Sequence, residues 1–210
     1  RDDVESRGLG DVYKRQVLIE SEPVEITCYR SDGEYIGHRK PAQVTFESSL
    51  EEDLKRRDFT VNAMAYSPKE GLIDLYGGQG DLEKGIIKCV GEPEKRFDED
   101  ALRILRGLRF SSCLGFEIEE KTSKAILEQR ELLKSISAER IASELKKLLC
   151  GKGARKILLD YREVIAVFIP ELRESFDFRQ NNPHHFLDVY GHICLSVENV
   201  RPQWQMRLTM

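Results

Sequence analysis

The apolar residues of this chain change their spacing once, close to Gly91. Before that point they occur in short runs, and the segment from Val24 to Tyr29 alternates apolar and polar side chains, as a strand with one buried face does. Beyond it they recur every three to four residues over longer segments, which is the period of an amphipathic helix. Because strand-like and helix-like segments do not alternate, the pattern predicts an α+β protein in which a mixed, β-rich part precedes an all-helical part.

Capping residues and chain breakers set the limits of the expected helices. The helical part is expected to hold helices at 98–113, 119–133, 137–150 and 154–164. Near the C-terminus, Pro183 suits the first turn of another helix, and a further helical pattern begins at Trp204. Residues 1–16 are charged and rich in turn-forming residues, and we expect them to be a non-native leader.

Composition excludes several classes of protein. No run of about 18 apolar residues is present and no secretory signal pattern is found, so a cytoplasmic protein is expected. The five cysteines are scattered and form no C-x-x-C pair, which argues against a disulfide framework or a zinc site and predicts small buried hydrophobes. With a net charge of −4, any contact with RNA must come from local groups of Lys and Arg.

The segment 54–66 sets several polar side chains into an apolar frame. Arg56 and Arg57 offer planar groups of donors that suit phosphate oxygens. Asp58 and Asn62 are short polar groups that can hold a ribose hydroxyl or fix the backbone. A solvated helix end followed by a strand explains the same residues, so this segment by itself leaves both interpretations open.

The segment 96–110 predicts a helix with one polar and one apolar face. The apolar face holds Ala101, Leu105 and Leu108. The polar face holds Arg96, Glu99, Asp100, Arg103 and Arg106. This polar face can be a ladder of weak intrahelical ion pairs. Alternatively, an Asp beside an Arg presents an acceptor next to a donor, which matches the exocyclic amine and ring nitrogen of cytosine or adenine but not uracil or guanine.

Three other patterns are weaker indications of a functional site. Asp98 and Asp100 resemble a D-x-D metal pair, but residues two apart on a helix do not share a face, so we reject them as the metal site. The glycines in 74–82 lack the order of a P-loop and predict a structural turn. A loose cluster near the C-terminus has spacing that a metal site can use, although surface and capping roles explain it as well. Its members are His184, His185, Asp188 and His192.

Taken in order, these segments resemble the motifs of the class II tRNA nucleotidyltransferases, the family of bacterial CCA-adding enzymes and poly(A) polymerases. RRDFTVNAMAY resembles the ribose-recognising motif, the segment 74–78 the hinge-like motif, EDALRILRGLRF the base-templating motif and ISAERI the neck motif. The resemblance implies a partial polymerase-beta-like nucleotidyltransferase head with a mixed sheet at 17–90. It also implies an all-helical neck and body at 91–172 and the start of a helical HD domain at 173–210.

The resemblance also implies roles for single residues. Asp100 and Arg103 would select the base of CTP or ATP, and Glu99 would brace this templating pair. The residues implied to bind the incoming nucleotide are Arg57, Asp58, Asn62, Asp100, Arg103, Arg106 and Arg109. On the helical body, a group of basic residues would touch tRNA phosphates, although a solvated helix end explains the same group. Its members are Lys146, Lys147, Lys152 and Arg155.

The resemblance predicts that the parent protein transfers CMP and AMP from CTP and ATP to the 3′ end of tRNA, with Mg²⁺ as cofactor. The D-x-D strand and the triphosphate turn that the family places before Val24 are not found, so the Mg²⁺ ligands are expected outside this chain and the fragment is expected to be inactive. Glu25 is at most an accessory carboxylate, and His192 resembles the first metal ligand of an HD site. A poly(A) polymerase of the same superfamily and a non-catalytic RNA-binding fragment are the alternatives.

Overall fold

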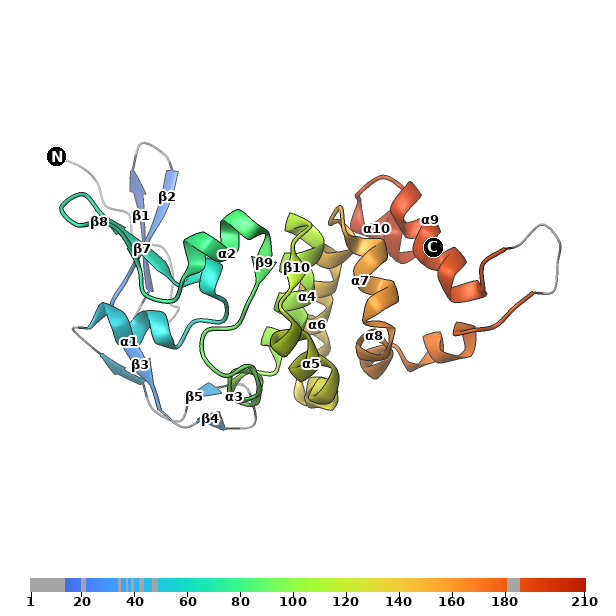
Figure 1. The fold of residues 1–210 in the computed structure, drawn as a ribbon, viewed down its shortest axis with the longest axis horizontal. Coiled ribbons are helices and arrows are strands. Elements are labelled where there is room, and N and C mark those ends of the chain that lie inside the picture. Colours follow the sequence, from blue (N-terminus) through green and yellow to red (C-terminus); the bar gives the residue numbers. More distant parts are fainter. Residues whose placement is uncertain are drawn as a thin grey trace.

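The computed structural model describes residues 14–19, 22–33, 35–36, 38, 40–41, 44–46, 49–180 and 186–210. Most strands gather at one end of an elongated molecule, two short ones lie beside the central helices, and helices follow one another along the rest of it (Figure 1). The two helices nearest the C-terminus lie at the end opposite to the strands. The α+β fold with a β-rich head and a helical body is therefore confirmed.

The strands form ladders of two within the described ranges. The antiparallel pairs are β1 (Lys14–Ile19) with β2 (Glu22–Thr27), β3 (Arg30–Asp32) with β6 (Val44–Phe46), β4 (Tyr35–Ile36) with β5 (Lys40–Pro41), and β7 (Met64–Ser67) with β8 (Gly71–Asp74). The parallel pair is β9 (Ile86–Ile87) with β10 (Glu117–Ile118). In β1, Lys14 pairs with Thr27, so the hairpin includes the last residues of the expected leader, of which 1–13 lie outside the described residues.

Most helices are short and follow one another closely. They are α1 (Leu50–Lys55), α2 (Gly78–Lys84), α3 (Pro93–Glu99), α4 (Leu102–Leu114), α5 (Glu120–Glu128), α6 (Ala138–Leu149), α7 (Ala154–Asp160), α8 (Arg162–Phe168), α9 (Val189–Asn199) and α10 (Trp204–Leu208). Among the described residues, three 3₁₀ helices lie between them, at Thr60–Asn62, Arg130–Ser135 and Pro170–Ser175. No helix in the described part of the chain is both long enough and apolar enough to span a membrane.

The helix predicted at 98–113 is interrupted near its start. The prediction was wrong for the first turn of that helix. Asp100 has extended backbone angles, φ −139° and ψ 102°, and it separates α3 from α4. Its carboxylate accepts a hydrogen bond from the backbone N–H of Leu102 at 3.2 Å, as an aspartate before a helix often does. A uniform turn of about 100° per residue therefore does not hold across Asp100.

Other predicted helices differ in their limits. The helix predicted at 154–164 is divided at Tyr161, where the backbone leaves the helical region. The one predicted at 119–133 continues after Glu128 as a 3₁₀ helix. Pro183 lies outside the described residues. Helix α9 begins at Val189, and Asp188 caps it, because its side chain accepts a hydrogen bond from the N–H of Gly191 at 2.7 Å.

Helix α4 lies at the centre of the hydrophobic core. The predicted apolar face is confirmed, because Leu105 and Leu108 are fully buried. On the side of the head, Phe59 is also fully buried, and a Cβ added at Gly107 would lie 3.1 Å from its Cζ. Because the glycine leaves this room, the head segment that contains Phe59 packs directly on α4.

The cysteines are less uniform than composition predicts. Cys89 and Cys194 are buried, and burial raises the pKa of Cys89 to about 12, which makes its thiol inert. Cys28 and Cys113 are exposed, so the expectation of buried cysteines was wrong for these two. Exposure of Cys28 follows from its position after β2, all six residues of which are exposed.

The turn after α6 approaches the backbone of α4 closely. The carbonyl of Ser112 accepts a hydrogen bond from Gly153 N–H at 2.9 Å, and the Ser112 hydroxyl donates to Leu148 O at 2.7 Å. A Cβ added at Gly151 would lie 2.5 Å from the carbonyl carbon of Ser112 and 2.6 Å from its oxygen. Since these are backbone atoms held by hydrogen bonds, a side chain at Gly151 cannot be accommodated by a rotamer change.

We expect Gly151→Ala to lower the free energy of unfolding by about 2–3 kcal/mol, because the added methyl group overpacks the contact with α4. Gly80→Ala is the matched control, since nothing lies within 4 Å of a Cβ added there. In helix α2 that change is expected to be neutral or stabilising by up to about 1 kcal/mol. Urea unfolding followed by circular dichroism measures both, and equal stability of the two variants would contradict the predicted clash.

Candidate functional site

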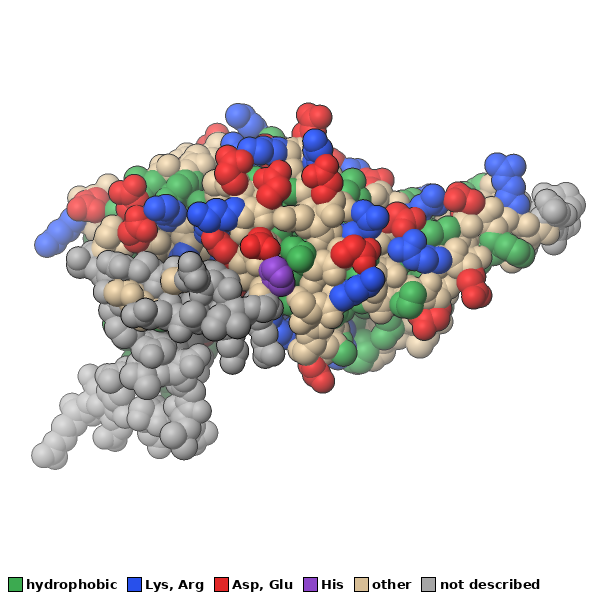
Figure 2. Space-filling view, turned by 90° about the horizontal axis from the view of Figure 1, so that it is seen from below, with side chains coloured by type: hydrophobic (Ala, Val, Ile, Leu, Met, Phe, Trp, Pro, Cys, Tyr) green, Lys and Arg blue, Asp and Glu red, His purple; other side chains and the backbone are tan. Residues whose placement is uncertain are grey.

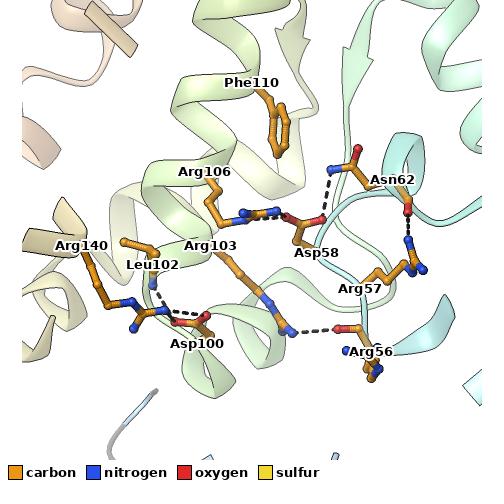
Figure 3. Close-up of a pocket in the computed structure, with 10 residues that line it drawn as sticks. All are labelled: Arg56, Arg57, Asp58, Asn62, Asp100, Leu102, Arg103, Arg106, Phe110 and Arg140. Carbon is orange, nitrogen blue, oxygen red and sulfur yellow. Dashed lines mark hydrogen bonds and ion pairs between the residues drawn. The ribbon is translucent and has the colours of Figure 1, made fainter. Parts of the chain in front are cut away.

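A cavity of about 560 Å³ opens between the head and the first turns of α4 (Figure 3). Its walls come from the segment after α1, from the α3–α4 junction and from α6. The lining residues are Arg56, Arg57, Asp58, Asn62, Asp100, Leu102, Arg103, Arg106, Phe110 and Arg140. Arginines far outnumber the two aspartates in this set, so the cavity has the charge that suits a polyanion such as a triphosphate.

Asp58 joins the head to α4 at the cavity wall. Its Oδ1 accepts hydrogen bonds from the N–H of Phe59 at 2.9 Å and from Asn62 Nδ2 at 3.2 Å. Its Oδ2 accepts from Arg106 Nε at 2.7 Å (Figure 3). Asp58 is only 8% exposed, so these bonds form in a poorly solvated place and fix the guanidinium of Arg106. This geometry favours the second of the two predicted roles of Asp58 and Asn62, which is to fix the local structure.

Asp53 contacts both adjacent arginines, Arg56 and Arg57, through its carboxylate. The sequence patterns did not single out this residue. Its Oδ1 accepts from Arg56 Nε at 3.1 Å, and its Oδ2 accepts from Arg57 Nη2 at 3.2 Å. Burial disfavours the charged carboxylate, but the hydrogen bonds and the charges of the arginines outweigh burial and hold the pKa of Asp53 below its ordinary value. Arg57 also donates to the carbonyl of Asn62 at 3.0 Å.

Glu99 holds Arg103 in place, as the bracing role requires. Its Oε1 lies 2.7 Å from Arg96 Nη2, and its Oε2 lies 2.7 Å from Arg103 Nη1. Arg103 also donates to the backbone carbonyls of Arg96 at 3.0 Å and Arg56 at 2.8 Å. Arg103 is only 7% exposed, which a residue on the solvated face of a helix would not be. The carbonyl of Arg56 comes from the head, so Arg103 also bridges the two parts of the molecule.

Asp100 lies opposite an arginine that sequence reasoning did not choose. Arg140 Nη2 is 3.4 Å from Asp100 Oδ2 and 3.5 Å from Oδ1 (Figure 3). Arg140 belongs to α6 and to the ISAERI segment, which was recognised as a motif without a role for this side chain. Asp100 and Arg103 both line the cavity, so its wall contains a carboxylate and a guanidinium.

The cavity brings together all but one of the residues predicted to bind a nucleotide. Those that line it are Arg57, Asp58, Asn62, Asp100, Arg103 and Arg106. Arg109 does not, because it points toward α6, where its Nε lies 2.6 Å from Oε2 of the buried Glu144. Its guanidinium also stacks over the ring of Phe110, with Cζ 3.9 Å from the ring centroid.

The basic residues predicted to contact RNA lie apart from the cavity, on α6, on α7 and in the turn between them. Lys146 Nζ lies 4.1 Å from the ring centroid of Trp204, and Arg155 Nη1 lies 3.0 Å from Glu198 Oε2. Lys147 and Lys152 are exposed. Figure 2 shows side chains of both charge signs interspersed over the described part of one face, which agrees with the near-neutral composition.

The carboxylates of the described residues do not fit a Mg²⁺ site. No group of three or more His, Cys, Asp or Glu in the described ranges is arranged to hold a metal ion. In the cavity, Asp58 and Asp100 both face arginines. Glu25 lies on the exposed strand β2 and does not line the cavity, and His192 lies on α9 at the far end of the molecule (Figure 1).

Two protein families match separate parts of the chain. Residues 8–88 match the family described as the Poly A polymerase head domain. Residues 115–176 match the family described as a probable RNA and SrmB-binding site of polymerase A. The first match contains the cavity residues of the head, and Asp100, Arg103 and Arg106 lie between the two matches.

The curated relatives are longer proteins. The CCA-adding enzyme of Bacillus subtilis (strain 168) is 47% identical over 142 residues, which are 68% of this chain and 36% of that protein. The CCA-adding enzyme of Lactobacillus delbrueckii subsp. bulgaricus (strain ATCC BAA-365 / Lb-18) is 49% identical over 145 residues, which are 69% of this chain and 37% of that protein. The chain therefore spans little more than a third of the length of these relatives.

Solved structures agree with these relatives. The Bacillus stearothermophilus CCA-adding enzyme in complex with CTP matches with a TM-score of 0.64 and 44% identity, over 70% of this chain and 35% of that one. The Thermotoga maritima CCA-adding enzyme complexed with tRNA matches with a TM-score of 0.63 and 25% identity, over 93% of this chain and 47% of that one.

We expect Asp53→Asn to lower the free energy of unfolding at pH 7 by about 1–3 kcal/mol, because it removes the buried charge that holds two arginines. Since the pKa of Asp53 is lower in the folded than in the unfolded chain, the stabilisation is present at neutral pH and is lost as the pH falls below about 4. The difference between the original chain and the variant should therefore shrink in acid.

The matched control is Glu52→Gln on the same helix. Glu52 pairs with Lys55 at 3.3 Å, with both side chains well exposed, so its loss should cost about 0.5 kcal/mol or less. Urea unfolding between pH 3 and pH 7 measures both variants. A pH-independent difference for Asp53→Asn would contradict the proposed role of the charge.

Proposed function

The chain belongs to the class II tRNA nucleotidyltransferase and poly(A) polymerase family, and we propose that the protein it represents adds CMP and AMP from CTP and ATP to the 3′ end of tRNA. The observation that carries this proposal is the arginine-lined cavity in which Asp100 and Arg103 lie beside Arg57 and Arg106. The identity to CCA-adding enzymes, rather than the family name alone, favours CCA addition over poly(A) synthesis. A cytoplasmic site of action is proposed with it.

The arginines would bind the triphosphate of the incoming nucleotide. Guanidinium groups offer paired donors that match phosphate oxygens, and they stay charged at every physiological pH. Arg106 is held by Asp58 and Arg57 by Asp53, so their orientations are fixed before a ligand arrives. Such preorganisation reduces the conformational entropy that binding would otherwise cost.

Asp100 and Arg103 would select the base. The carboxylate can accept from the exocyclic amine of cytosine or adenine, while the guanidinium donates to the neighbouring ring nitrogen. Uracil and guanine present a carbonyl where the amine is needed, and the resulting unpaired buried groups would reject them. Glu99 would keep Arg103 in the required position through its 2.7 Å contact.

The tRNA would lie along the helical body, where Lys146, Lys147, Lys152 and Arg155 can approach phosphates. Residues 115–176, which include all four, match the family described as a probable RNA and SrmB-binding site of polymerase A, and this supports the assignment. Mg²⁺ is proposed as the cofactor of the whole protein. Because no described carboxylates form a site for it, no step of the transfer is assigned to a metal held by these residues.

In the whole protein, we expect Asp100→Ala to reduce the preference for CTP over UTP by about 100-fold or more, because the group that recognises the amine is lost. The measurement is kcat/KM for each of the four nucleoside triphosphates on tRNA that lacks its 3′ CCA, with the products sequenced. Glu94→Ala, an exposed change on α3, is the control and should leave the preference unchanged. Unaltered selectivity in Asp100→Ala would refute the templating role, and runs of adenine in the products would favour poly(A) synthesis.

A further inference from the structure

The break between α3 and α4 leaves backbone groups that a continuous helix would pair. In an α-helix each N–H bonds the carbonyl four residues earlier, so Ala101 would bond Phe97 and Leu102 would bond Asp98. Here Leu102 N–H bonds the side chain of Asp100 instead. The N–H of Ala101 and the carbonyl of Asp98 therefore need partners from elsewhere.

Both partners come from one residue of the head, His38. Its backbone carbonyl accepts a hydrogen bond from Ala101 N–H at 3.1 Å. Its Nδ1 lies 2.6 Å from the carbonyl oxygen of Asp98, and since a carbonyl can only accept, Nδ1 carries the proton of this bond. The same nitrogen is 3.2 Å from Asp98 Oδ1. One head residue thus supplies the acceptor and the donor that the broken helix lacks.

His38 lies between β4 and β5 in an uncommon backbone conformation. Its φ is 53°, in the left-handed region that few residues other than glycine adopt, although asparagine and histidine tolerate it better than most. The cost of this conformation, on the order of 1 kcal/mol, must be offset by contacts of the same residue. The two hydrogen bonds to the α3–α4 junction are contacts of that kind.

We infer that His38 is a positioning residue, which keeps α3 and α4 apart so that Asp100 stays outside the helix and faces the cavity. This inference rests on the proposed function, because it assigns to His38 an effect on base selection through Asp100. If the donor on His38 is removed, Asp98 O becomes available again to Leu102 N–H, and that bond would draw Leu102 away from the Asp100 carboxylate. The carboxylate would then lose the bond to Leu102 that, together with the contact to Arg140, orients it.

Two substitutions at His38 separate the hydrogen bond from backbone strain. His38→Gly removes the donor and suits a positive φ, while His38→Asn keeps a donor near the place of Nδ1 and also tolerates that φ. Asp98→Ala is the matched control, because it removes the exposed carboxylate near His38 but keeps the carbonyl. All three are made in the whole protein.

The first measurement is the ratio of kcat/KM for CTP to that for UTP. We expect His38→Gly to lower this ratio about tenfold, the effect of losing one hydrogen bond, and His38→Asn and Asp98→Ala to keep it within about threefold. A general loss of stability would lower the rates with both nucleotides and leave the ratio unchanged. An unchanged ratio in His38→Gly would overturn the inference.

The second measurement is amide hydrogen exchange at Ala101 without nucleotide. His38→Gly should speed exchange there at least about tenfold, because the residue that carries the acceptor carbonyl loses its side-chain bond to Asp98 O, and His38→Asn should not. Exchange that is the same in all variants would overturn the positioning role. If the original protein shows no base preference at all, the proposed function fails, and hydrogen exchange alone then decides whether His38 holds the junction.

Discussion

The packing of Phe59 against Gly107 is the contact on which the rest of the site depends. It joins the head to α4 in a fully buried place, and the ring of Phe110 meets that of Phe59 edge to face with centroids 5.8 Å apart. The neighbours of Phe59 in the chain, Asp58 and Asn62, are thereby brought to the wall of the cavity. An apolar contact thus determines where the polar groups of the site can meet.

The second constraint is the charge of the cavity. Arginines gathered in one place repel one another, and each needs a nearby anion or carbonyl to be held in a single orientation. Asp53, Asp58 and Glu99 supply the anions, each in contact with one or two guanidinium groups. The acidic residues around the cavity therefore act mainly on the arginines, and Asp100 does so through Arg140.

Part of this arrangement follows from sequence alone. The change of period near Gly91 predicted the β-rich head and the helical body, because burial of one face imposes a period on each kind of element. The apolar face of α4 was predicted correctly for the same reason. Motif chemistry also identified most residues of the cavity, since the arginines and short polar groups within each motif are neighbours in the chain. The roles of Arg103 as a bridge and of Arg109 as the partner of Glu144 did not follow from it.

Tertiary structure decided the contacts between residues that lie far apart in the chain. Arg140 reaches Asp100 from another helix, and the helix break at Asp100 is completed by His38 from the head. A periodic pattern reports only which face of an element is buried, and it assumes that each N–H bonds its own helix. When a distant residue offers a competing donor or acceptor, the local hydrogen bonds and the tertiary ones are similar in free energy, and only the assembled fold determines which of them form.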